Sequence, residues 1–96
     1  MKAYQVTINF EWNDEFASLT PAHRTYVNKL INKNVIDQYV ISMESQRVLI
    51  TLNAESKTAV EKILKKSPLH KYSTYEIDEL FVLDGQLNWV PVVSPN

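Results

Sequence analysis

Apolar and polar residues alternate with a period of two along residues 3–11, near the start of the chain. The large apolar residues of this segment occupy the even positions, which are Tyr4, Val6, Ile8 and Phe10. The polar residues occupy the odd positions, which are Gln5, Thr7, Asn9 and Glu11. Because successive side chains of a strand point to opposite faces, this pattern predicts a strand with one buried face.

A helix is predicted to begin at Thr20-Pro21, after a connection over residues 12–19 that has no clean period. Threonine can accept a hydrogen bond from a free backbone N–H, and proline loses none at the first helical position. Asn34 is predicted to end this helix in a left-handed backbone conformation. Apolar residues follow the start at helical spacing, at Ala22, Tyr26, Val27, Leu30 and Ile31.

The remaining segments predict a hairpin, a second helix and a last strand. Residues 35–43 and 47–53 are two strands so close in sequence that they must form an antiparallel hairpin. The second helix runs from about residue 55 or 56 to residue 66, because Ser67-Pro68 stops it. A further strand is predicted over residues 73–83.

The order strand-helix-strand-strand-helix-strand (βαββαβ) predicts an α+β fold of ferredoxin-like plan. Short right-handed connections then give a four-stranded antiparallel sheet with both helices on one face. We predict one ferredoxin-like domain over residues 1–83. Asp84-Gly85 is a strong turn signal, so residues 84–96 are expected to form a C-terminal hairpin or edge-strand arm.

The composition excludes several classes of protein. Ten Lys and Arg against eleven Asp and Glu leave a net charge of −1, which provides no basic patch for nucleic acid. No apolar run approaches the roughly 18 residues that span a membrane. The chain has no cysteine and one glycine, which excludes disulfides, thiolate nucleophiles, Cys-based zinc sites and glycine-rich phosphate loops. We expect no metal, no cofactor, no nucleic-acid or membrane partner, and a cytoplasmic location, since the strand pattern begins at once without a signal peptide.

The sheet face that points away from the predicted helices has a mixed character. Polar residues such as Gln5 and Thr7 alternate there with apolar ones such as Leu49 and Leu80. A chain of 96 residues has a modest core of its own, so we predict a homodimer joined through this face, with polar residues around a central cleft. The alternative is a solvated face on a monomer, which antiparallel sheets tolerate.

Two short segments resemble known families. Residues 67–72 (SPLHKY), followed by Tyr75-Glu76-Ile77, resemble the "PL-x-x-Y … E-I" stretch of muconolactone isomerase-like proteins. Residues 20–30 (TPAHRTYVNKL) are similar to the "P-x-H-x-x-Y-L-x-x-L" helix of YCII-related domains. Both families belong to the dimeric α/β-barrel group, in which ferredoxin-like chains join sheet to sheet. The resemblance implies a homodimer or higher homo-oligomer, with a pocket between sheet and helices for small organic acids, lactones or related metabolites.

His23 is the first catalytic candidate, because its counterpart in the YCII-like helix is the suspected acid/base residue of that family. It lies at the third position of the predicted helix, and the carboxylate of Asp37 could orient it. Histidine suits general acid–base chemistry because its pKa lies near neutrality. The alternative is a half-exposed histidine in the first turn with no role.

Glu76 is the second catalytic candidate. Glu76 and Asp78 are two residues apart, so both are predicted to lie on the polar face of the sheet. Two close carboxylates there would raise the pKa of one of them, as a catalytic acid requires. The alternative is a structural ion pair in which Arg47 or Lys2 neutralises these carboxylates.

Five residues are candidates for ligand binding. Gln5, Thr7 and Asn9 would surround the cleft on the polar face of the sheet. His70 lies in the loop before the last strand, where it would either bind an anionic ligand or simply face solvent. Tyr72 would line a pocket or an interface, where amphipathic aromatic residues are favoured.

The resemblance favours a small-metabolite enzyme that moves a proton on a small organic acid or lactone without a cofactor, as an isomerase does. The alternative is a non-catalytic dimeric module that binds a ligand or merely assembles. A closed, partly apolar cavity that holds His23 or Glu76 with an inward-facing partner would favour the enzyme. A collapsed interior would favour the module.

Overall fold

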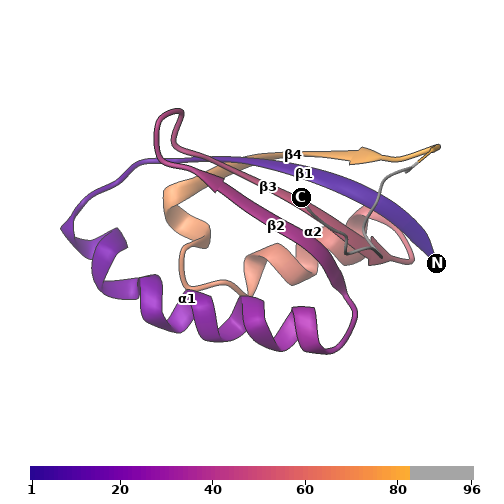
Figure 1. Cartoon of the computed structure of the whole chain (residues 1–96), viewed down its shortest axis with the longest axis horizontal. Helices are drawn as coiled ribbons and strands as arrows, with labels where there is room; N and C mark the ends of the chain where they lie inside the picture. The colour runs from indigo at the N-terminus through magenta and orange to yellow at the C-terminus, as the bar shows by residue number, and fades with distance from the viewer. Residues whose placement is uncertain (83–96) are drawn as a thin grey trace, which may run out of the picture.

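The computed structural model describes residues 1–82. In chain order the elements are β1 (Lys2–Phe10), α1 (Asp14–Asn32), β2 (Ile36–Ser42), β3 (Arg47–Ala54), α2 (Lys57–Lys65), the short 3-10 helix η1 (His70–Tyr72) and β4 (Ser73–Glu79). The strands form one antiparallel sheet in the order β2-β3-β1-β4, with both helices on one face (Figure 1). The predicted α+β, ferredoxin-like βαββαβ fold is therefore confirmed. The arm predicted over residues 84–96 lies outside the described residues, and within residues 1–82 neither helix is long and apolar enough to cross a membrane.

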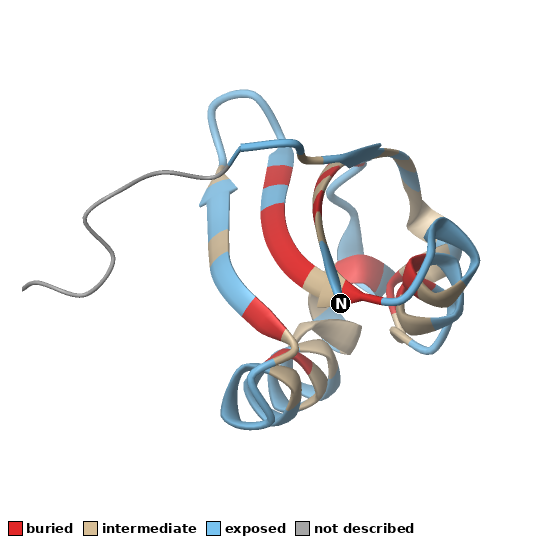
Figure 2. Ribbon diagram, turned by 90° about the vertical axis from the view of Figure 1, so that its right-hand side faces the viewer, coloured by how far each residue is buried: buried red, intermediate tan, exposed pale blue. Residues whose placement is uncertain are grey.

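The core lies between the sheet and the helices. β1 is a central strand, in which Val6 lies opposite Ile50 of β3 on one side and Ile77 of β4 on the other. The apolar residues on the helix-facing side of β1 and β3 are buried, as the alternation predicts: Tyr4, Val6, Ile8, Phe10, Val48, Ile50 and Leu52. Val27 of α1 and Val60 of α2 pack into the same core. Figure 2 shows buried residues on the inner strands and on the helix sides that face them.

Helix α1 begins more than one turn before the Thr20-Pro21 start expected from the sequence. Asn13 caps it, because the Asn13 Oδ1 accepts a hydrogen bond from the Phe16 N–H at 2.7 Å. Thr20 is not a cap, since its hydroxyl donates to the Phe16 carbonyl one turn back (3.1 Å). Pro21 is accommodated inside the helix, although it cannot donate the backbone hydrogen bond of its turn. The correction moves His23 from the first turn to the middle of α1.

The path into and along β2 decides which of its residues face the helices. Asn34 follows α1 with a φ of 63°, the left-handed conformation expected there. The pairing of β2 with β3 then shifts register between Ile36 and Gln38, so that Asp37 is an extra residue in a bulge. Because of this bulge, both Ile36 and Tyr39 contribute to the helix side of the sheet despite their odd spacing.

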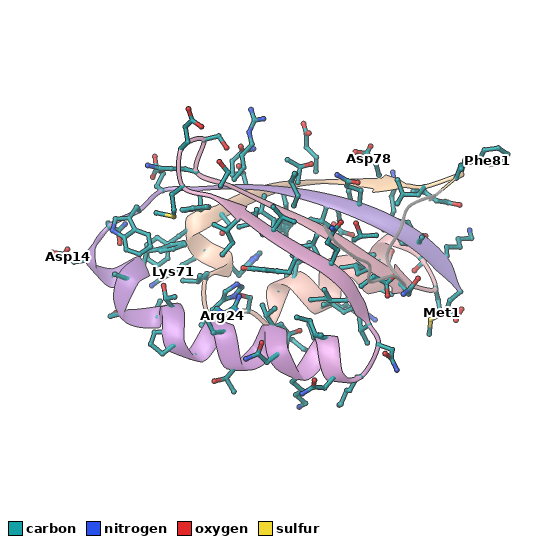
Figure 3. All side chains as sticks on the ribbon, in the orientation of Figure 1. Met1, Asp14, Arg24, Lys71, Asp78 and Phe81 are labelled. Carbon is teal, nitrogen blue, oxygen red and sulfur yellow. The ribbon has the colours of Figure 1, made fainter. Side chains whose placement is uncertain are left out.

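Strand β4 ends at Glu79, earlier than the predicted end at residue 83. The Leu80 N–H still donates to the Ala3 carbonyl at 2.9 Å, one residue from the start of β1 at Lys2. Phe81, which lies within the strand predicted over residues 73–83, is instead fully exposed beyond the end of β4 (Figure 3).

Candidate functional site

His23 joins three parts of the fold through its ring nitrogens. The imidazole projects from α1 into the layer between helices and sheet, where its Nε2 lies 2.7 Å from the hydroxyl of Tyr39 on β2. Its Nδ1 lies 2.8 Å from the Oγ of Ser67, in the loop that follows α2. The result is a continuous hydrogen-bonded chain, Ser67–His23–Tyr39, which we call the relay.

The surroundings keep the relay uncharged. Burial lowers the pKa of His23 below the usual value for histidine, and the positive charge of Arg24 adds to the decrease. Burial raises the pKa of the Tyr39 phenol, an effect that Arg24 opposes. Near pH 7 the imidazole therefore carries one N–H and one free lone pair, and the phenol keeps its proton.

A neutral relay has two hydrogen-bond arrangements. Ser67, His23 and Tyr39 each carry one hydrogen, while only two hydrogen bonds join them, so one hydroxyl hydrogen remains free at one end. In one arrangement Tyr39 donates to Nε2 and the Nδ1–H donates to Ser67. In the other both bonds are reversed and the Tyr39 O–H is free. The relay can therefore either accept or deliver a proton at Tyr39.

Two cavities flank His23 at the place expected between sheet and helices. The inner cavity, of about 40 Å³, is lined mainly by apolar side chains of α1, α2 and the sheet. The outer cavity, of about 80 Å³, lies beside the first half of α1 and is also lined by Arg24 and Tyr39. A water-sized group occupies about 10–15 Å³ of such a volume, so the two cavities take about three and about six such groups. His70 reaches the inner cavity, and its buried Nδ1 has no hydrogen-bond partner within residues 1–82.

Asp37 does not orient His23, contrary to the expectation from the sequence. Its exposed carboxylate accepts a hydrogen bond from the Asn53 side-chain amide at 3.0 Å. Both ring nitrogens of His23 are occupied by Ser67 and Tyr39 instead. The bulge in β2 is the physical reason, because the extra residue displaces Asp37 from the regular alternation and leaves Tyr39 on the helix side.

Glu76 lies on the sheet face that points away from the helices, which we call the outer face. Its partner in register on β1 is Thr7, and Thr7 in turn lies opposite Leu49 on β3. Asp78, two residues along the same strand, also projects from the outer face (Figure 3). The sheet therefore separates Glu76 from His23, and the two do not form one site within a single chain.

The ion pairs considered for Glu76 and Asp78 do not occur within the part of the chain that the structure describes. Lys2 instead reaches Glu79, with 3.9 Å between the Lys2 Nζ and a carboxylate oxygen. Arg47 donates to the Asn9 Oδ1 at 3.2 Å. Both contacts are exposed, so they contribute little to the free energy of unfolding.

The predicted ligand-binding residues fall into two groups. Gln5, Thr7 and Asn9 lie on the outer face, whereas His70 and Tyr72 belong to η1. His70 lines the inner cavity, and Tyr72 borders a surface pocket together with Asn9. None of the pockets found within residues 1–82 brings all five residues together. Their roles in ligand binding stay predictions.

Three members of the site were not anticipated as functional: Arg24, Tyr39 and Ser67. Tyr39 carried a signal, because a phenol among apolar residues on a buried strand face needs a hydrogen-bond partner. Ser67 carried none, since a residue before proline is fully explained as a helix stop. Arg24 is an exposed residue of α1 that follows His23 in the chain and lines the outer cavity.

Residues 20–30 and residues 67–72 meet at this site. His23 comes from the first of these segments, and its partner Ser67 comes from the second. No protein-family model matches the chain, and no curated protein sequence matches it either.

Proposed function

We propose that this protein is a cofactor-independent enzyme of the dimeric α/β-barrel type, similar to muconolactone isomerase-like and YCII-related proteins, that transfers a proton on a small organic acid. The observation that carries the proposal is the relay, in which an uncharged histidine is hydrogen-bonded at both nitrogens and ends at a phenol in a cavity. A path for a proton through an imidazole needs a hydrogen-bond partner at each ring nitrogen, and His23 has one at both.

The proposed reaction begins with Tyr39 donating to the His23 Nε2 and the Nδ1–H donating to Ser67. Tyr39 takes a proton from a substrate carbon while passing its own proton to Nε2. The products of this step are an enolate and an imidazolium, so protons and charges balance. Returning the proton through Tyr39 to a different carbon completes an isomerisation. The lowered pKa of His23 favours this return, because the imidazolium is a stronger acid than usual.

The test is the exchange of substrate C–H protons with deuterated solvent, followed by NMR across a panel of short unsaturated acids and lactones. We expect exchange with at least one compound, and its loss in His23→Gln and in Tyr39→Phe. Asn28→Ala, on the exposed side of α1, is the matched control and should keep the activity. Exchange that persists in Tyr39→Phe, or its absence with every compound, would refute the proposal.

A second candidate is a non-catalytic module that binds a small ligand. The small size of the cavities favours it, since about six water-sized groups fill the larger one and most metabolite sites are more spacious. Ligand binding without any proton exchange would identify this function.

We also propose that the protein is a homodimer joined through its outer face. Val40 and Leu49 lie opposite each other in one cross-strand pair and remain 42% and 39% exposed. Their exposure contrasts with that of Thr51, two residues along β3 from Leu49, which is only 8% exposed. A second copy packed on this face would cover the apolar pair, and a stable interface of this kind buries more than about 1,000 Å² in total.

A further inference from the structure

Among residues 1–82, the outer cavity is lined by one cation and by no carboxylate. Arg24 is an exposed residue of α1 (Figure 3), and its guanidinium carbon lies 5.5 Å from the centre of the Tyr39 ring. The ion pairs formed within residues 1–82 are Lys2 with Glu79 and Lys71 with Glu15, and neither involves Arg24. Of the described residues that line the cavity, Arg24 is the single charged one. The cavity therefore offers a net positive charge to whatever enters it.

The opposite wall of the cavity is aromatic and aliphatic. Phe16 stacks on Phe10, with ring centres 5.0 Å apart, and packs against Trp12 at 5.3 Å. Trp12 and Met43, which also line the cavity, are both at least half exposed. An inorganic anion would gain nothing from this wall, so the lining suits an ion with an apolar body.

We infer that the outer cavity binds a short monocarboxylate, with its carboxylate on Arg24 and its carbon chain against Phe16 and Trp12. Planar guanidinium and carboxylate groups form paired hydrogen bonds, which makes arginine the better match for this charge. The volume of about 80 Å³ takes about five to eight non-hydrogen atoms, the size of crotonate. A carboxylate held on Arg24 would lie near Tyr39, because the guanidinium carbon is 5.5 Å from the centre of the Tyr39 ring.

The monocarboxylate site rests on the proposed function, because it is placed beside the relay. Ligand binding is nevertheless measured separately from proton transfer. The probe is crotonate, and its uncharged isostere crotonamide is the comparison. Trp12 reports binding by its fluorescence in a Trp89→Phe background, where it is the single indole of the chain. We expect saturable quenching by crotonate and binding of crotonamide that is at least about tenfold weaker, because the charge-assisted hydrogen bonds are lost.

The Arg24 variants test the anchor itself. Arg24→Gln should weaken crotonate binding at least about tenfold, and Arg24→Lys should weaken it less, since a charge remains without the paired geometry. Arg47→Gln is the matched control, because Arg47 is on the outer face, and it should bind as the wild type does. Equal binding of crotonate and crotonamide, unchanged binding in Arg24→Gln, or displacement of crotonate by equimolar inorganic phosphate would each overturn the inference.

The experiments distinguish failure of the monocarboxylate site from failure of the proposed proton transfer. Tyr39→Phe should still bind crotonate, because the carboxylate anchor is intact, while it loses proton exchange. Binding that depends on Arg24 without exchange in the wild type would uphold the monocarboxylate site and refute proton transfer. Exchange on a compound without a carboxylate, with no effect of Arg24→Gln, would uphold proton transfer and refute the monocarboxylate site.

Discussion

Acidification from pH 7.5 to pH 5.5 should destabilise the folded protein through His23. The folded state lowers the pKa of His23 from its ordinary value of 6.5, first through burial and second through Arg24. Below pH 6.5 the unfolded chain therefore binds a proton at this residue more readily than the folded chain. Stability is full above pH 6.5 and falls as the pH drops from there towards the lower pKa of the folded state.

The size of the effect has an upper bound. A group that titrates at pH 6.5 when unfolded and stays neutral when folded changes the free energy of unfolding by at most about 1.4 kcal/mol between these two pH values. His23 is partly exposed, and solvent screening reduces the contribution of such a group. We therefore expect about 0.3–1 kcal/mol from His23 itself.

The assay is urea unfolding of the wild type and of His23→Gln at both pH values. Glutamine does not titrate and can still hydrogen-bond to Ser67 and Tyr39, so it keeps the relay partners satisfied. Subtracting the pH effect in the variant from that in the wild type removes the contributions of all other titrating groups. The same loss of stability in both proteins, or a wild type that becomes relatively more stable at pH 5.5, would refute the argument.

Three further predictions concern the fold and the assembly. Val27→Ala should lower the free energy of unfolding by about 1–3 kcal/mol, because Val27 is only 2% exposed in the core. Asn28→Ala should change the free energy of unfolding by no more than about 0.5 kcal/mol. Equal effects of the two substitutions in urea melts would mean that the buried face of α1 is misassigned. Asn13→Ala should cost about 1 kcal/mol through loss of the helix cap, and an unchanged urea midpoint would contradict that role. Light scattering should find a dimer of the wild type and a monomer of Leu49→Lys, and a monomeric wild type at micromolar concentration would rule out the outer-face dimer.

The sequence by itself determined the features that depend on neighbouring residues. Alternation at period two identified β1 and its buried side, because a strand sends successive side chains to opposite faces. Asn34 was correctly expected in a left-handed conformation, since that choice depends on one residue type after a helix. The order of elements then led to the ferredoxin-like sheet, because few topologies join such elements with short right-handed connections.

Only the tertiary structure decided where the side chains meet. The start of α1 depends on the burial of Phe16 against Phe10, two residues that no local period connects. The bulge at Asp37 arises from the pairing of β2 with β3. Because of this bulge, His23 is hydrogen-bonded to the phenol of Tyr39 and not to the expected carboxylate of Asp37. The relay joins residues 16 and 44 positions apart in the chain. Hydrogen bonds at such separations depend on packing of helices against the sheet, which local patterns do not encode.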